Sequence, residues 1–422
     1  MMPTDSLSPF SVDHLDPRSP NYAIDVVDKL IVAAVASDAS DVHIQPRAEG
    51  WDVMFRIDGV LSAAEPIRSG GDSDPVKRLM VMAGLPTYRS GQPMEGRLRL
   101  ESTAPDDRAS IRLGIYPTIH GPRATIRLLR KSNAYDRLPS LGLADDVAAN
   151  LTDLCRQTDG AILLSGPAGS GKTTTLYAML RLIASSAPRR SVVTIEDPVE
   201  SIIADISQSE LDPSAGMTLA KALRSAVRQD SEVLLVSEIR DPETAEAALQ
   251  TSLTGHLVFS SLHATDVAAS LRRLVQFGIP AYIVRSGIRA IVTQRLLRRR
   301  CSDCAPPNDT PTALTPPDDT AATATSLNAP SKVDAAVCEN CLGTGYRGQI
   351  AIANCVRFDG NDPVGDALAD ALTAGSSTRV MRDAAHQAGL IDLHQRANQC
   401  VQAGLTDPAE VYRVLGSPAV VR

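Results

Sequence analysis

A glycine-rich segment between an apolar run and a helical run constrains the fold of this chain most strongly. The segment GPAGSGKT (166–173) follows AILL (161–164) and precedes TTLYAML (174–180). Its glycines let the backbone turn so that successive N–H groups converge on an anion. The N-terminus of the following helix adds its partial positive charge. The pattern predicts a strand, a phosphate-binding loop and a helix; an ordinary glycine-rich turn is the alternative, and the flanking elements argue against it.

The loop also predicts which residues contact a nucleotide. Lys172 can reach the β- and γ-phosphates of ATP, and the Thr173 hydroxyl can ligate Mg²⁺. The full set of expected nucleotide-contacting residues in this segment is Gly166, Pro167, Gly169, Ser170, Gly171, Lys172, Thr173 and Thr174.

Two acidic segments follow later apolar strands. TIEDPVE (194–200) comes at the end of one strand, and VLLVSE (233–238) ends another with a carboxylate. In a parallel sheet the carboxyl ends of the strands face the nucleotide crevice. Glu196 is therefore expected near an attacking water or a Mg²⁺ ion, and Glu238 fits the Walker B arrangement that holds Mg²⁺ or its water. Polar loops without a catalytic role are the alternative.

Two histidines flank a further short strand in TGHLVFSSLHATD (254–266). His256 and His263 could each hydrogen-bond a γ-phosphate, and His263 is expected to emerge near the crevice. A purely structural hydrogen bond remains the other interpretation of either histidine.

The pattern of elements changes along the 422 residues, which are enough for two or three domains. The first part predicts a small α+β domain, with helices at 22–35 and 75–83 and strands at 42–44, 52–57, 97–100, 110–115 and 124–129. From about residue 143, helices alternate with strands, which predicts a parallel sheet covered on both faces. Its expected strands are 161–165, 191–195, 232–236 and 257–260, with clear helices at 218–228 and 242–253.

Four of the seven cysteines form two C-x₂-C pairs, Cys301 with Cys304 and Cys338 with Cys341. Such pairs are typical of a structural tetrathiolate Zn²⁺ site, with free thiols as the alternative. The intervening residues 305–332 are rich in Pro, Thr, Ala and Asp, so we expect them to be disordered. Cys155, Cys355 and Cys400 fit ordinary buried thiols.

Composition narrows the function classes. The net charge of −7 and an aromatic content of 3% argue against nucleic-acid binding, although the basic cluster at 295–300 keeps a nucleic-acid translocase as the alternative. The N-terminus lacks a secretory signal and no apolar run reaches membrane-spanning length, so we expect a cytoplasmic protein.

Taken together and in this order, these segments resemble the ATPases of bacterial type II secretion and type IV pilus assembly. The resemblance covers nearly everything from about residue 22. Besides the loop and the acidic and histidine segments, it is carried by LRSAVRQD (223–230), VSEIRD (236–241), TQRLLRRRC (293–301), SDVHIQP (40–46), RIDGV (56–60), EGRL (95–98) and IRLGIYP (111–117).

The resemblance implies an α/β fold: a RecA-like P-loop ATPase core with a small α+β, PAS-like N-terminal domain, a zinc-knuckle element and a C-terminal helical region. The expected divisions are a disordered tail (1–20), the PAS-like domain (21–131), the ATPase core (132–300), the tetracysteine element with its disordered insert (301–345) and the helical region (346–422).

The resemblance also implies roles. The family works as a homohexameric ring in which arginines of the first domain reach ATP bound between the two domains. By position these are Arg97 and Arg112, with Arg127 as a third; solvated strand faces are the alternative. Glu196 resembles the water-activating glutamate and Glu238 the Walker B glutamate. The implied cofactors are ATP, Mg²⁺ and structural Zn²⁺. The implied partners are inner-membrane platform proteins, which would hold the chain peripherally at that membrane, with no nucleic acid.

Several positions depart from the family pattern without removing an expected catalytic group. They include Met94, Glu95, Pro122, Ser231, Glu232, Ser237, Gln349 and Asn354. Only about 20 residues precede the shared region, where many family members carry a docking domain. Retraction ATPases also lack that domain, but they generally lack the cysteine pairs, so an assembly or secretion motor is favoured. A nucleotide-binding scaffold without turnover is the remaining rival, and the two glutamates disfavour it.

Overall fold

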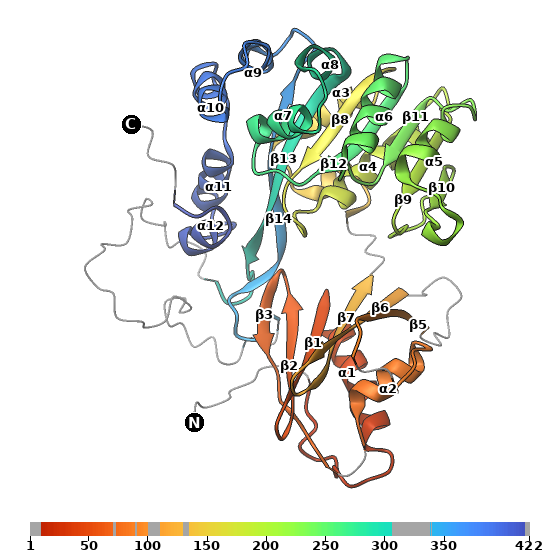
Figure 1. Ribbon diagram of the computed structural model, residues 1–422. Coiled ribbons are helices and arrows are strands. Elements are labelled where there is room, and N and C mark those ends of the chain that lie inside the picture. The colour runs from red at the N-terminus through yellow and green to blue at the C-terminus, as the bar shows by residue number, and fades with distance from the viewer. Residues whose placement is uncertain are drawn as a thin grey trace. The chain divides into compact units, whose positions relative to one another are not determined.

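The computed structural model describes residues 10–70, 73–88, 91–99, 110–129, 135–305, 338 and 340–417. These divide into two compact units, which are described separately. The first contains residues 10–129 together with 301–305, 338 and 340–348, and the second contains 135–300 and 349–417 (Figure 1).

The first unit is an antiparallel sheet with two helices packed on one face. The strand order is β3-β2-β1-β7-β6-β5, and β4 pairs with β2. The inward side chains of the sheet and of both helices form one buried apolar cluster. The elements are α1 (Tyr22–Ala36), β1 (Asp41–Arg47), β2 (Gly50–Ile57), β3 (Val60–Ala63), β4 (Ile67–Arg68), α2 (Pro75–Met82), β5 (Met94–Arg99), β6 (Ser110–Thr118) and β7 (Gly121–Leu129).

Most of these elements are predicted from the sequence, and local chemistry explains them. The Asp74 side chain accepts the N–H groups of Val76 and Lys77, which fixes the start of α2. Asp58 and Gly59 both have positive φ, as a tight hairpin turn between β2 and β3 requires. The short strands β3 and β4 are not predicted, because four and two residues give too little alternation to recognise.

The sequence predicts a disordered tail over residues 1–20, and the structure corrects this for its second half. Residues 1–9 lie outside the described residues. Phe10 and Val12 are 1% and 4% exposed and belong to the apolar cluster of the first unit. The Phe10 ring lies 6.1 Å from that of Phe55, and the Val12 N–H donates to Glu65 Oε2. Two apolar residues among many polar ones are enough to anchor this segment, because each removes a large side chain from water.

Phe10→Ala is therefore expected to destabilise the chain by about 3 kcal/mol, since it leaves a cavity beside Phe55. Urea unfolding followed by circular dichroism measures the change. Ile119→Ala is the matched control: Ile119 is 95% exposed, and its loss should alter stability by less than about 0.5 kcal/mol. Equal effects of the two substitutions would contradict the burial of Phe10.

The second unit is built on a sheet with the order β10-β9-β11-β12-β8-β13-β14. The pairs from β10 through to β13 are all parallel, which confirms the predicted α/β core. The strands are β8 (Gly160–Ser165), β9 (Val192–Glu196), β10 (Ser207–Glu210), β11 (Val233–Val236), β12 (Leu257–Leu262), β13 (Ile288–Arg300) and β14 (Tyr346–Arg357), whose first residues belong to the first unit.

Helices cover both faces of this sheet (Figure 1). Alternation along β8 places Ala161 and Leu163 in one apolar cluster, with residues of α5 to α10, and Ile162 and Leu164 in another, with α3 and α4. The helices are α3 (Asp145–Leu154), α4 (Lys172–Ala184), α5 (Leu219–Ala226), α6 (Pro242–Leu253), α7 (Val267–Gln276), α8 (Ala281–Gly287), α9 (Pro363–Thr373), α10 (Thr378–Gln387), α11 (Leu393–Gln402) and α12 (Pro408–Leu415). None of the helices in the described ranges is long and apolar enough to cross a membrane.

Two long strands of this sheet differ from the sequence prediction. Residues 346–422 are expected to be a helical region, yet Tyr346–Arg357 forms β14, and the helices begin at Pro363. β13 is not predicted either. Both contain buried apolar stretches that periodicity alone cannot separate from a helix, because strands buried on both faces lose their alternation. Of the predicted disordered insert 305–332, all but Ala305 lies outside the described residues.

Candidate functional site

The parallel sheet brings four chain segments to one edge. Leu262 at the end of β12 is paired with Ser165 at the end of β8, and Val236 at the end of β11 with Ile195 in β9. The residues that follow these pairs therefore emerge together at the carboxyl edge of the sheet. They are the glycine-rich loop from Gly166, Glu196, the segment from Ser237 to Glu238, and His263.

The glycine-rich loop has the shape of an anion cradle. Gly171 is in the left-handed region (φ 82°, ψ 15°) immediately before α4. A Cβ atom there would lie 2.7 Å from Gln294 Nε2, and one on Gly166 would lie 2.4 Å from Ser170 Oγ. A side chain is thus excluded at Gly166 and at Gly171. The buried Ser170 hydroxyl has no hydrogen-bond partner among the described residues.

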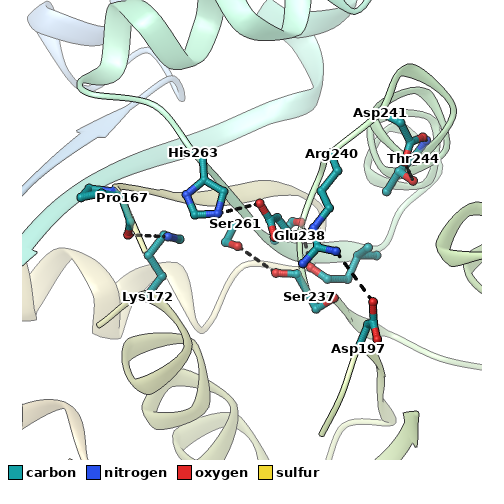
Figure 2. A network of polar contacts seen from close by, with 12 residues as sticks. Pro167, Lys172, Asp197, Ser237, Glu238, Arg240, Asp241, Thr244, Ser261 and His263 are labelled. Carbon is teal, nitrogen blue, oxygen red and sulfur yellow. Dashed lines mark hydrogen bonds and ion pairs between the residues drawn. The ribbon is translucent and has the colours of Figure 1, made fainter. Parts of the chain in front are cut away.

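Lys172 lies folded back over this loop. Its Nζ donates to the carbonyl oxygens of Gly166 and Pro167 at 2.8 and 2.9 Å. Figure 2 shows the contact with Pro167. Burial lowers the pKa of Lys172, the nearby Arg295 lowers it further, and the Glu238 carboxylate opposes both effects. The lysine is 8% exposed, so its charge acts at short range in a partly dry site. Thr173 and Thr174 follow in the first turn of α4.

Glu238 is at the centre of a polar network shown in Figure 2. Its Oε1 lies 2.9 Å from His263 Nε2, and its Oε2 accepts a hydrogen bond from Arg240 Nε at 2.7 Å. His263 Nδ1 lies 3.2 Å from the Gly166 carbonyl oxygen, so this ring connects Glu238 to the glycine-rich loop. The hydrogen bond to Glu238 raises the pKa of Arg240, which also forms a 3.7 Å ion pair with Asp197.

Glu196 is more deeply buried than Glu238, at 2% exposure. Its Oε1 accepts hydrogen bonds from Thr194 Oγ1 at 2.6 Å and from Gln208 Nε2 at 3.1 Å. Its Oε2 accepts a hydrogen bond from the Tyr177 hydroxyl. Three hydrogen-bond donors offset much of the free-energy cost of removing this carboxylate from water.

The structure does not bring His256 to this site. His256 precedes β12, and its carbonyl oxygen accepts the N–H of Gly160 at the start of β8. This is the amino edge of the parallel strands, about 20 Å from the carboxyl edge across a six-residue strand. Its Nδ1 lies 3.5 Å from Thr254 Oγ1, which fits the structural interpretation of this histidine.

The predicted arginines lie in register across the sheet of the first unit. Arg97 in β5 pairs with Arg112 in β6, and Arg112 pairs with Arg127 in β7. All three side chains are exposed. Arg112 is ion-paired with Glu95, and Arg127 Nε donates to Asp41 Oδ1 at 3.0 Å. The three arginines therefore form a row on one face of this sheet, in which Arg112 and Arg127 are each paired with a carboxylate.

The four paired cysteines form a cluster that could hold a metal ion, with all four sulfurs within 4.8 Å of one another. The Sγ atoms of Cys301 and Cys338 are 3.8 Å apart, and those of Cys304 and Cys341 are 3.5 Å apart. A tetrahedral site with Zn–S bonds of about 2.3 Å needs sulfurs separated by about 3.8 Å. The Cys301 N–H donates to the Gly345 carbonyl within the element, and the Gly348 N–H that follows it donates to Asp58 Oδ2 in the turn between β2 and β3.

Three residues that contact the glycine-rich loop, Glu196 or the segment after His263 at the carboxyl edge of the sheet were not predicted from the sequence. Gln294 in β13 donates to the Ser170 carbonyl and accepts from Thr175 Oγ1, which braces the loop. Arg295 donates to the Thr265 carbonyl just beyond His263. Tyr177 contacts Glu196 from α4. The segment TQRLLRRRC contained the first two, and a polar pair within an apolar strand was the signal that could have identified them.

Comparisons with known proteins agree on one family. The family described as "Type II/IV secretion system protein" matches residues 18–413. The chain is 35% identical over 408 residues to the type II secretion system protein HxcR of Pseudomonas aeruginosa, covering 96% of this chain and 80% of HxcR. It is 34% identical over 390 residues to the type IV pilus assembly ATPase PilB of Thermus thermophilus, covering 91% of this chain and 42% of PilB.

A solved structure supports the fold. The ATPase DotB of Legionella pneumophila matches with a TM-score of 0.68 at 21% identity, covering 96% of this chain and 96% of DotB. At this level of identity the similarity concerns the arrangement of helices and strands.

Proposed function

The chain belongs to the type II/IV secretion system protein family and is an ATPase, and we propose that it hydrolyses ATP to drive assembly of a pilus or a type II secretion pseudopilus. The family membership confirms the resemblance carried by the sequence motifs. The observation that supports hydrolysis most directly is the convergence of the glycine-rich loop, Glu238 and His263 at one edge of the parallel sheet.

Each residue at that edge has a chemical task in this proposal. Lys172 and the loop N–H groups hold the phosphates and neutralise charge on the transferred phosphoryl group. Glu196 orients or deprotonates the attacking water. His263, which contacts Glu238 and the Gly166 carbonyl, hydrogen-bonds the γ-phosphate. Thr173 and Glu238 would hold Mg²⁺, whose charge neutralises phosphate oxygens when it is bound.

The arginine row supplies the last part of the proposed site. Arg97 and Arg112, with Arg127 beside them, carry fixed positive charge that can act on the γ-phosphate as arginine fingers do. We propose that this occurs within a homohexamer. Elution of the MgATP-bound chain at the mass of six copies, measured by multi-angle light scattering, tests the oligomer.

We propose that the cysteine cluster holds a structural Zn²⁺. Cys301, Cys304, Cys338 and Cys341 would provide four thiolates and leave no position for water, so the ion would brace the element rather than react. The two sulfur separations of 3.8 and 3.5 Å are close to those of a tetrahedral zinc site, which supports this proposal.

The expected result is about one zinc per chain by elemental analysis, and less than about a tenth of that in Cys304→Ser, because three thiolates bind zinc far more weakly than four. Cys400→Ser removes a cysteine outside the cluster and should keep the full zinc content. Equal zinc in the two variants would contradict the assignment.

The proposed location is the cytoplasmic face of the inner membrane, where platform proteins of the secretion or pilus machine would bind the chain. The proposal is tested by complementing a deletion strain and scoring secreted protein and surface pili. The wild-type chain should restore either the secretion of protein or the assembly of surface pili. Stimulation of phosphate release by single- or double-stranded DNA would instead favour the nucleic-acid translocase.

A further inference from the structure

Glu196 receives hydrogen bonds from three different elements. Thr194 belongs to β9 itself, Gln208 comes from β10, and Tyr177 comes from α4. The first two share Oε1, whereas Tyr177 binds Oε2. Of these three donors, Tyr177 alone lies on the helix that begins at Lys172.

The position of the Tyr177 hydroxyl is fixed by packing. The side chain is 3% exposed and belongs to the apolar cluster between α4 and the sheet. Its ring cannot move without opening that cluster, because protein interiors are close-packed. Burial, followed by the contact with Glu196, strongly raises the pKa of Tyr177, so the hydroxyl keeps its proton and remains a donor at neutral pH.

The hydroxyl uses both of its hydrogen-bonding capacities. It donates its proton to Glu196 Oε2 and accepts the backbone N–H of Glu200 at 3.2 Å. It therefore joins the carboxylate, the segment that follows β9 and the phosphate-binding helix at one oxygen atom. Phenylalanine would fill the same space and provide neither contact.

We propose that Tyr177 is the positioning residue for hydrolysis: its hydroxyl holds the Glu196 carboxylate in a fixed orientation relative to the helix that carries Lys172. The inference rests on the proposed role of Glu196 in activating water. Movement of the glycine-rich loop on binding ATP would be passed through α4 to Tyr177 and so to the carboxylate. Without the hydroxyl, Glu196 keeps its two Oε1 donors, but Oε2 can rotate away from the water.

The test compares Tyr177→Phe with the wild-type full-length chain in steady-state phosphate release and in binding of a fluorescent ATP analogue. We expect kcat to fall by about 10-fold, the effect of losing one hydrogen bond to a charged group. Affinity for the analogue should stay within about twofold, because the loop and Lys172 are unchanged. Tyr282→Phe, at an exposed tyrosine, is the matched control and should leave both values unchanged.

A double variant separates positioning from a structural effect. In a Glu196→Gln chain, adding Tyr177→Phe should cause no further loss of kcat, because the residue acts through that carboxylate. An unchanged kcat in Tyr177→Phe, a further 10-fold loss in the double variant, or loss of nucleotide binding would each overturn the proposal. Wild-type activity in Glu196→Gln would show instead that the proposed role of Glu196 itself is wrong.

Discussion

Lys172→Ala is expected to reduce phosphate release by at least about 10³-fold. The substitution removes the charged group that lies over the loop between Gly166 and Pro167, at the position where phosphates would bind. Because the lysine is largely buried, bulk water cannot replace its charge. Affinity for ATP should fall as well, since the lysine binds the ground state and the transition state alike. A coupled-enzyme phosphate assay with a titration of MgATP measures both parameters.

The matched control is Lys221→Ala. Lys221 is exposed in α5, and its Nζ donates to the Gly216 carbonyl at 3.2 Å. Its loss should change kcat by less than about twofold, as is usual for an isolated surface contact. If Lys172→Ala hydrolysed ATP at the wild-type rate, the assignment of the whole edge would be wrong.

Local signals made the glycine-rich loop predictable. Its glycines adopt backbone angles, or approach other atoms so closely, that a side chain would be blocked. The pattern that reveals this lies within eight consecutive residues. The same holds for α2, where Asp74 and Pro75 define the start. The parallel sheet with helices on both faces was predicted from the alternation of helix and strand, whereas the order of its strands was not.

Strand direction and contacts between distant residues explain the differences from the sequence predictions. His256 and His263 flank the same strand, so they lie at opposite edges of the sheet. Phe10 is one aromatic residue in a polar segment, and its partner Phe55 is 45 positions away along the chain (55 − 10). The sequence predicts Tyr177 only as a core residue of a helix. The hydrogen bond from its hydroxyl to Glu196 is visible only in the structure.

The two glutamates at the nucleotide edge have different surroundings, which leads to different expected tasks. Glu238 accepts a hydrogen bond from Arg240 and lies close to His263, whose ring also contacts the Gly166 carbonyl, so we propose that it acts on the phosphate and the metal. Glu196 has neutral donors only: a hydroxyl from Thr194, an amide from Gln208 and a phenol from Tyr177. No described cation is bonded to it. We therefore propose Glu196, and not Glu238, as the carboxylate that acts on the attacking water.

Glu196→Gln is therefore expected to lower kcat by about 10² to 10⁴, the usual contribution of a general base, because the amide cannot take a proton from water. ATP affinity should stay within about threefold, since no described contact joins Glu196 to the glycine-rich loop. Single-turnover quench measurements separate hydrolysis from product release, and binding of a fluorescent ATP analogue measures affinity.

Two comparisons make this result specific to Glu196. Glu246→Gln removes the charge of an exposed glutamate on α6 and should preserve kcat. Glu238→Gln should weaken the binding of Mg²⁺, so that its activity recovers partly at raised Mg²⁺, whereas Glu196→Gln should not recover at any Mg²⁺ concentration. If raised Mg²⁺ restored the kcat of Glu196→Gln, Glu196 would be a metal ligand and not the group that activates water. Glu238 would then be the candidate general base.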